Sequence, residues 1–261
     1  MQPKLSIITV NLNNAEGLQK TIESVVSQTF TDYEYIIIDG GSTDGSKEII
    51  ERYADKITYW VSEPDKGIYN GMNKGLFKTI GKYVFFLNSG DYFLTNNVLE
   101  KVSANTLNYD FLFTGVLKSD EESGTKFRDI PKNVDKISLF KKMICHQSIF
   151  VKKNVFDKIG YFDTKYKIKA DYEWLLRAIT KNEFLLGYFS EVITYYPLGG
   201  VSDKYYNKYT PKENRIIWSI YYSPKSEKFL RRYIYRPSLN KIMQKLLSID
   251  MFRAFVLKKI S

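Results

Sequence analysis

The stretch Tyr83-Val84-Phe85-Phe86-Leu87-Asn88-Ser89-Gly90-Asp91 decides the fold of this chain. Its apolar part, Tyr83 to Leu87, has the length of a buried strand and is short for a helix. The following Asn-Ser-Gly predicts a sharp turn, and Asp91 comes directly after it. Open α/β sheets bind ligands at the carboxyl ends of their strands, so we expect this carboxylate to lie at a ligand site.

Two earlier strands end in the same way. The run Leu5 to Val10 leads into Asn11, and the run Tyr33 to Ile38 leads into Asp39 and a glycine-rich turn. Helical patterns between the runs indicate repeated βαβ units, and therefore a mostly parallel central sheet flanked by helices. The expected strands are 4–10, 33–38, 57–61 and 83–87, and the expected helices lie near 15–28, 44–54 and 70–79. Neither a G-x-G-x-x-G motif nor a P-loop motif is present, which argues against those two kinds of phosphate site.

Beyond Asp91 the pattern is mixed. The polar stretch from Lys118 to Lys126 predicts a surface hairpin or a mobile loop. From Pro211 onward the pattern predicts helices that Pro224 and Pro237 interrupt. The other expected elements are strands at 110–116, 148–151, 184–189 and 192–196, and helices near 96–105, 154–159 and 170–181.

The composition fits one α/β domain with an appendage, because 261 residues exceed what one such domain needs. The one cysteine, Cys145, excludes an internal disulfide and is consistent with a reducing compartment. The N-terminus has no signal-peptide pattern, and no apolar run is long enough to span a bilayer. We therefore expect a cytoplasmic protein, either soluble or peripheral on the inner face of the cell membrane.

The basic charge is concentrated at the C-terminus. The chain carries a net charge of +10, and residues 223–261 hold ten Lys and Arg against Glu227 and Asp250. We divide the chain into residues 1–205, the α/β domain, and residues 206–261, a basic helical extension. Its mixture of basic and apolar residues favours association with an anionic membrane surface. The alternative is a helical subdomain that packs on the core. Nucleic acid is not an expected partner, because no recognition module accompanies the charge.

The motifs together resemble the family 2 glycosyltransferases, which have the Rossmann-like GT-A fold of nucleotide-diphospho-sugar transferases. The strong resemblance covers roughly residues 5–95, and a looser one continues to about residue 200. It is carried by the segments Ser6–Asn11, Ser24–Phe30, Ile36–Gly45, Glu63–Asn70, Asn73–Gly75 and Leu87–Asp91.

The resemblance implies an inverting transfer of a sugar from a nucleotide-diphosphate donor, with a UDP-sugar expected, to a glycan or lipid-linked glycan acceptor. The implied setting is bacterial capsule, lipopolysaccharide or exopolysaccharide assembly. Such a transfer needs a divalent cation to neutralise the leaving diphosphate and a base to deprotonate the acceptor hydroxyl.

Asp91 is the expected metal ligand, for Mn²⁺ or Mg²⁺. Members of the family end this strand in two or three acidic residues, whereas here only Asp91 keeps a carboxylate. A single carboxylate binds a cation weakly until the diphosphate arrives. The alternative is that Asp91 caps the helix that follows.

Asp39 is the expected uridine-binding residue, because a uracil N3–H could donate a hydrogen bond to it. The alternative is an Asx-turn that opens the glycine-rich loop. By the same resemblance, the other residues expected at the nucleotide sugar are Thr9, Asn11, Asp65, Asn73, Lys74 and Asn88, with Lys74 also open to a role as a solvated helix lysine.

Asp171 is the expected catalytic base, in the segment where the family has a Glu-Asp pair and this chain has Ala170-Asp171. Helical geometry places Asp171 on the same face as Trp174 and pairs Glu173 with Arg177 instead. The alternative for Asp171 is a helix N-cap. His146 is expected on the acceptor side of the cleft, where it could contact the diphosphate, bind the metal or satisfy a buried hydrogen bond.

Two rival functions are open at this stage. A sugar-nucleotide nucleotidyltransferase would need a basic glycine-rich loop after the first strand, and 11–17 contains no basic residue. A non-catalytic module that binds nucleotide sugar or glycan would fit the acidic positions replaced at Asn88, Gly90 and Ala170. That second alternative predicts that Asp171→Asn leaves function intact.

Overall fold

The first half of the chain forms the predicted parallel sheet. The computed structural model describes residues 2–105, 108–120, 123–181, 183–234 and 256. Strands β1 (Leu5–Asn11), β2 (Tyr33–Asp39), β3 (Tyr59–Ser62) and β4 (Tyr83–Phe86) pair in parallel in the order β3-β2-β1-β4. Helices α1 (Ala15–Val26), α2 (Ser46–Arg52) and α3 (Ile68–Lys78), with the 3₁₀ turn η1 (Ala54–Lys56), connect them.

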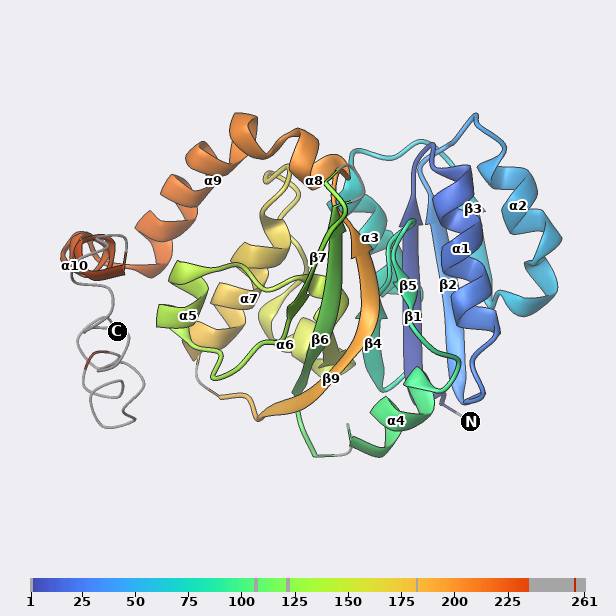
Figure 1. Cartoon of the computed structure of the whole chain (residues 1–261), viewed down its shortest axis with the longest axis horizontal. Helices are drawn as coiled ribbons and strands as arrows, with labels where there is room; N and C mark the ends of the chain where they lie inside the picture. The colour runs from blue at the N-terminus through green and yellow to red at the C-terminus, as the bar shows by residue number, and fades with distance from the viewer. Residues whose placement is uncertain (1, 106–107, 121–122, 182, 235–255, 257–261) are drawn as a thin grey trace.

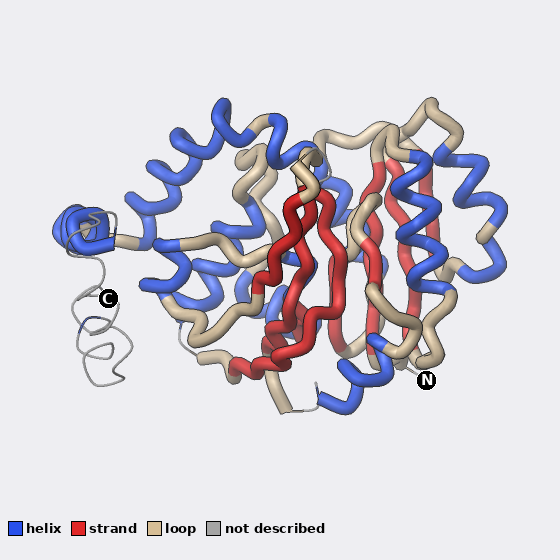
Figure 2. The backbone as a smooth tube through the Cα atoms, in the orientation of Figure 1, coloured by secondary structure: helices blue, strands red, loops and turns tan. Residues whose placement is uncertain are grey.

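Strands β1, β2 and β4 are mostly apolar and almost entirely buried, because helices cover both faces of this part of the sheet (Figure 2). Residues such as Ile8 and Ile36 pack on one face with α3, and the alternate residues such as Ile7 and Tyr35 pack on the other with α1 and α2. Each fully buried Ile contributes roughly 1.5–3 kcal/mol of hydrophobic free energy. Helix α3 lies close to β1, since a Cβ on Gly75 would come within 2.5 Å of the Ile8 side chain.

The second half of the sheet adds antiparallel strands to the predicted parallel part, so the sheet as a whole is mixed. Strand β8 (Ile149–Lys152) runs antiparallel to both β4 and β6 (Phe111–Asp120), because the chain enters β8 from the edge where β4 ends. Strand β9 (Leu186–Pro197) pairs in parallel with β6 and antiparallel with the short β5 (Tyr92–Phe93). The path through the sheet is β3-β2-β1-β4-β8-β6-β9-β5 within the described residues.

Strand β9 replaces the two strands predicted at 184–189 and 192–196. Its register with β6 shifts between Phe113 and Gly115, and this irregularity breaks the alternation that a single strand would show. The polar stretch predicted as a hairpin or loop is a hairpin of β6 and β7 (Thr125–Asp129). Helices α4 (Val98–Asn105), α5 (Lys136–Lys141), α6 (Lys153–Ile159) and α7 (Ala170–Lys181) complete the domain, with the 3₁₀ turn η2 (His146–Ser148) before β8.

The described part of the C-terminal extension packs on the rest of the chain. Of its helices, α9 (Tyr206–Tyr221) packs on α7 and α10 (Pro224–Ile234) on α5, whereas α8 (Val201–Lys204) lies at the upper edge of the sheet (Figure 1). Trp218 of α9 stacks on Phe140 of α5 and donates its indole N–H to the Tyr172 hydroxyl of α7 at 3.0 Å. Residues 235–255 and 257–261, including Pro237 and most of the basic tail, lie outside the described residues. Within the described part, no helix combines the length and the hydropathy that crossing a bilayer requires.

Candidate active site

The polar strand ends meet at one edge of the sheet. Asn11 lies opposite Asp39 in the β1–β2 register, and Asp39 lies opposite Ser62 of β3. Strand β4 is the other neighbour of β1 and leads through Leu87 into the turn from Asn88 to Asp91. This edge is the upper one in Figure 1, where α8 also lies.

Asp39 is enclosed by hydrogen bonds from its own surroundings. The Asn11 amide and the Ser42 hydroxyl donate to Oδ1, and the backbone N–H groups of Gly41 and Ser42 and the Ser62 hydroxyl donate to Oδ2. Burial alone would raise the pKa of Asp39, but the hydrogen bonds from Ser42 and Ser62 outweigh it and hold this pKa below its ordinary value. The structure thus contains the turn-forming arrangement weighed as the alternative for Asp39, and Gly41 permits it with φ of +83°.

Of the two β1 residues expected in the pocket, one faces away from it. Thr9 is fully buried, donates to the Leu87 carbonyl at 2.7 Å and lies 3.0 Å from the Tyr35 hydroxyl. It therefore ties strands together below the edge, which corrects its predicted place in the nucleotide pocket. Asn11 lies at the edge and supports Asp39, and its own Oδ1 is buried without a hydrogen-bond partner among the described residues.

Asp91 ends a tight turn that α1 holds in place. Gly90 has φ of +100°, the Asp91 N–H donates to the Asn88 carbonyl, and the Thr21 hydroxyl donates to the Asp91 carbonyl at 2.7 Å. The next helix begins at Val98, so the alternative that Asp91 is a helix cap is wrong. Asp91 is 4% exposed, and Gln147 of η2 donates to its Oδ2 at 2.8 Å. Burial raises the pKa of Asp91 to about 7, and His146 and Gln147 oppose this only in part.

The turn offers oxygen atoms that suit a hard cation. The Asn88 Oδ1 is buried and has no hydrogen-bond partner among the described residues, and the Asp91 carboxylate keeps part of its acceptor capacity unused. Oxygen ligands are those that Mg²⁺ and Mn²⁺ prefer. Within the described residues no group of three His, Cys, Asp or Glu side chains could hold a metal ion by itself. A cation would therefore need oxygens from the substrate beside those of this turn.

Buried Asp171 and partly buried His146 form a second polar group at the same edge. The His146 Nδ1 lies 3.2 Å from Asp171 Oδ2, and the Tyr69 hydroxyl donates to Asp171 Oδ1 at 2.8 Å. On its other side, His146 Nε2 lies 3.0 Å from the Asn88 amide nitrogen. That nitrogen only donates, so Nε2 accepts and Nδ1 donates its proton to Asp171. Asn88 and His146 thereby join the Asp91 turn to Asp171.

The structure agrees with one of the predictions made for the helix that contains Asp171 and disagrees with others. Glu173 pairs with Arg177 at 3.0 Å, as predicted. Helix α7 begins at Ala170, so Asp171 lies within its first turn and the N-cap alternative is wrong. Trp174 does not face a cleft, since it is 3% exposed and stacks on Phe156 in the core.

The remaining predicted residues fall into two groups. Asn73 binds the backbone N–H and C=O of Phe162 with both ends of its amide, so it anchors that loop and does not face the donor as predicted. Asp65 and Lys74 lie near the edge. The Asp65 side chain approaches Gly40 and Gly71, and Lys74 forms an ion pair with Glu63 at 2.7 Å.

Gln147 and Tyr69 are site residues that the sequence reasoning missed. Each donates to one of the two candidate acids, from elements far from those acids in the chain. The position of Gln147 next to His146 in the sequence could have indicated a site residue, whereas nothing in the sequence distinguished Tyr69 from an aromatic residue of the core.

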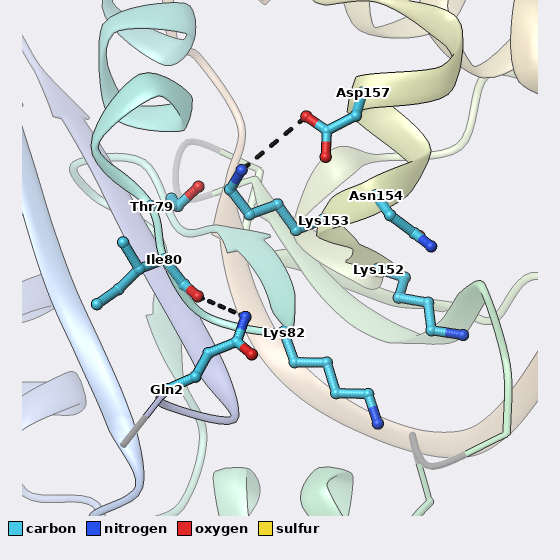
Figure 3. A pocket seen from close by; sticks show the side chains of 8 residues that line it. All are labelled: Gln2, Thr79, Ile80, Lys82, Lys152, Lys153, Asn154 and Asp157. Atoms are coloured by element: carbon cyan, nitrogen blue, oxygen red, sulfur yellow. Dashed lines mark hydrogen bonds and ion pairs between the residues drawn. The ribbon is translucent and has the colours of Figure 1, made fainter.

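A pocket of about 520 Å³ at the opposite end of the sheet does not share this chemistry (Figure 3). It lies where β4 begins and β8 ends, beside Lys82 and Lys152. Its carboxylate, Asp157, is 4.0 Å from the Lys153 ammonium, and the lysines at its rim are surface side chains.

Comparison with known proteins places the chain in a family. The profile described as "Glycosyl transferase family 2" matches residues 6–161. A "PGL/p-HBAD biosynthesis glycosyltransferase" of Mycobacterium tuberculosis is 30% identical over 82% of this chain and 86% of that protein. A "Cholesterol galactosyltransferase" of Borreliella burgdorferi is 40% identical over 34% of this chain and 25% of that protein.

Solved structures show the same fold at low sequence identity. S. aureus TarS 1-349 in complex with UDP-GlcNAc has a TM-score of 0.62 and 18% identity, covering 76% of this chain and 59% of that one. The mannosyltransferase PcManGT from Pyrobaculum calidifontis, in complex with GDP-Man and Mn²⁺, has a TM-score of 0.61 and 12% identity, covering 98% of this chain and 84% of that one. These likenesses show the GT-A fold, and the family match argues against the nucleotidyltransferase alternative. The chain belongs to glycosyl transferase family 2 and is a glycosyltransferase.

Proposed function

We propose that this enzyme moves a sugar from a nucleotide-diphosphate donor to a hydroxyl of a glycan or lipid-linked glycan, with inversion at the anomeric carbon. The observation that carries the proposal is the hydrogen-bonded connection from the Asp91 turn through Asn88 and His146 to Asp171. This connection supports the proposal because it brings Asp91 and Asp171, our candidates for the cation ligand and the base, to one sheet edge, and such a transfer requires both groups.

Asp171 acts as the base. Its Oδ1 and Oδ2 are already oriented by Tyr69 and His146, so the carboxylate is held in one position at little further cost in side-chain entropy. The acceptor hydroxyl gives its proton to Asp171 while its oxygen bonds to the anomeric carbon. The bond from that carbon to the diphosphate oxygen breaks on the opposite face.

Asp91 and Asn88 would hold Mn²⁺ or Mg²⁺ through their side-chain oxygens. A cation bound there would offset the negative charge that grows on the leaving diphosphate. Gln147 keeps the Asp91 carboxylate oriented toward that task with its hydrogen bond to Oδ2.

The nucleotide lies at the ends of β1 and β2. We assign the base contact to Asp39 or its loop, with Asn11 and Asp65 beside it, and we expect uridine. TarS binds UDP and UDP-GlcNAc, whereas PcManGT binds GDP-Man, so the fold accommodates either base. The hydrogen bonds that Asp39 already accepts imply that uracil would contact the preformed loop with little rearrangement.

The acceptor side includes the C-terminal extension. Lys208, Lys212 and Arg215 of α9 are exposed, and Glu213 of the same helix is buried. This exposed face is basic, which supports attraction to an anionic membrane surface that carries a lipid-linked acceptor.

The experiment that tests the donor half is a thermal-shift panel of UDP, GDP, CDP and dTDP with the full chain, each with and without Mn²⁺. We expect UDP to raise the unfolding temperature, and Mn²⁺ to increase this effect. Stabilisation by GDP or dTDP alone would replace the uridine assignment. No response to any of the four nucleotides would contradict the proposed donor and its site.

A further inference from the structure

Lys169 is a buried lysine that forms no ion pair within 4 Å among the described residues. It lies two residues before Asp171 and is 7% exposed. Its Nζ has the Met143 sulfur at 3.3 Å and lies 5.3 Å from the centre of the Tyr206 ring. A thioether is a weak acceptor and a ring attracts the charge only diffusely, so neither satisfies the three N–H donors of an ammonium group.

Two of the nearby carboxylates, those of Asp171 and Glu213, are engaged elsewhere. Among the described residues no carboxylate oxygen forms an ion pair with Lys169 within 4 Å. Asp171 is held by Tyr69 and His146, and Glu213 accepts the backbone N–H groups of residues 167 and 168 at 2.7 and 3.2 Å. A buried ammonium without an ion-pair partner is costly in the free protein, so an anion brought to it would be bound strongly.

The place of Lys169 in the fold points to the acceptor. Its neighbours belong to the segment after α5 and to α9, and these two helices lie on the other side of β6 from β1 and β2 (Figure 1). The donor nucleotide in our proposal lies at the ends of those two strands. A group that reaches Lys169 would therefore be carried by the molecule whose hydroxyl meets Asp171.

We propose that Lys169 is an acceptor-specificity residue that binds a negatively charged group, a carboxylate or a phosphate, next to the acceptor hydroxyl. This inference rests on the proposed function, in particular on Asp171 as the base. It assigns the acceptor to the class of acidic glycans, in which a uronic acid or a sugar phosphate occupies the accepting position.

The test titrates glucuronate, glucose 6-phosphate and neutral glucose into the full chain saturated with UDP and Mg²⁺, with binding measured by ligand-observed NMR. Saturation closes the donor site to the anions. We expect at least one anion to bind, and Lys169→Met to weaken it by about tenfold or more. Lys169→Arg should retain binding, and so should Lys47→Met, which removes an exposed lysine of α2. Binding of glucuronate would indicate a uronic acid in the acceptor, and binding of glucose 6-phosphate would indicate a sugar phosphate.

Three outcomes would overturn the inference. They are equal binding of glucose and the anions, binding of neither anion, and anion binding that Lys169→Met leaves unchanged. The unfolding temperature distinguishes an anion-binding lysine from a structural one. Lys169→Met removes an unpaired buried charge, so the unfolding temperature of the variant should equal or exceed that of the wild type. A clear decrease would indicate a structural lysine, and a large loss of UDP affinity would place Lys169 at the donor. Failure of UDP to bind the unmodified chain would instead contradict the proposed function.

Discussion

Asp39 and Asp91 lie at the same edge of one sheet, yet their surroundings are opposite. Asp39 accepts five hydrogen bonds from neighbouring backbone and side-chain groups, and these hold its pKa below the ordinary value. Asp91 is equally buried but accepts one side-chain hydrogen bond, from Gln147, and burial raises its pKa to about 7. The hydrogen bonds to the Asp39 carboxylate hold its loop in shape, whereas the Asp91 carboxylate still has lone pairs that could bind a ligand. We class Asp171 with Asp91, as an acid positioned for chemistry.

The largest effect should come from Asp171→Asn. Asparagine keeps the shape and one acceptor for Tyr69 or His146 but cannot take a proton from a hydroxyl. We expect the rate of nucleotide release from the donor sugar to fall by a factor of about 10²–10⁴. The matched control is Asp157→Asn, an acid at the opposite end of the sheet, which should keep its rate. A wild-type rate in Asp171→Asn would remove Asp171 from the chemistry.

Asp39→Asn should act on stability. The amide nitrogen of the new asparagine cannot accept a hydrogen bond. At least one group that now donates to Asp39 would therefore lose its partner while buried. We expect the free energy of unfolding to fall by about 2–3 kcal/mol. Urea unfolding measures this, with Asp163→Asn, a half-exposed acid beside Lys165, as the control. A stability within error of the wild type would show that the five hydrogen bonds do not hold the loop.

The two acids should also respond to pH with opposite signs in metal-free protein. The pKa of folded Asp39 is lowered, so its stabilising contribution is present above the unfolded value of about 3.9 and is lost as pH falls through the lower folded value. The pKa of folded Asp91 is raised to about 7, so ionising it costs stability as pH rises from about 4 to about 7. We therefore expect the difference in unfolding free energy between Asp39→Asn and the wild type, measured in EDTA from pH 3 to pH 8, to become smaller at acid pH. A constant difference across this range would contradict the assignment.

Tyr69→Phe should have the smallest effect. It removes one neutral donor from Asp171 Oδ1 and leaves His146 on Oδ2. We expect the transfer rate to fall by a factor of about 3–10. A loss as large as that of Asp171→Asn would show that Tyr69 takes a direct part in the reaction.

The sequence predicted where the site lies in the fold more accurately than it predicted what each residue of the site contacts. Three strands that end in polar residues predicted a binding edge, and the register of Asn11 with Asp39 confirms that the first two ends meet. The Asx-turn alternative anticipated the local hydrogen bonds to Asp39, but not the one from Ser62, because Ser62 comes from a strand more than twenty residues away. Thr9 was misplaced although strand alternation puts it on the same face as buried Ile7.

The second half of the sheet escaped prediction for a related reason. The directions of β8 and β9 depend on pairings between segments far apart in the chain, which no local pattern encodes. The contact between His146 and Asp171 has the same origin, since it joins η2 to α7. Tyr69 could not be distinguished from a core aromatic before that contact was known.

The most direct test of the contrast between the two strand-end acids is urea unfolding of Asp91→Asn beside the wild type, in EDTA, in UDP alone and in UDP with Mn²⁺. In EDTA the variant should be at least as stable as the wild type, because it removes a buried acid whose ionisation is unfavourable. UDP with Mn²⁺ should stabilise the wild type more than UDP alone does, and the variant should lose this additional stabilisation. A variant that is less stable in EDTA, or that UDP and Mn²⁺ stabilise as fully as the wild type, would show that Asp91 is a structural residue like Asp39.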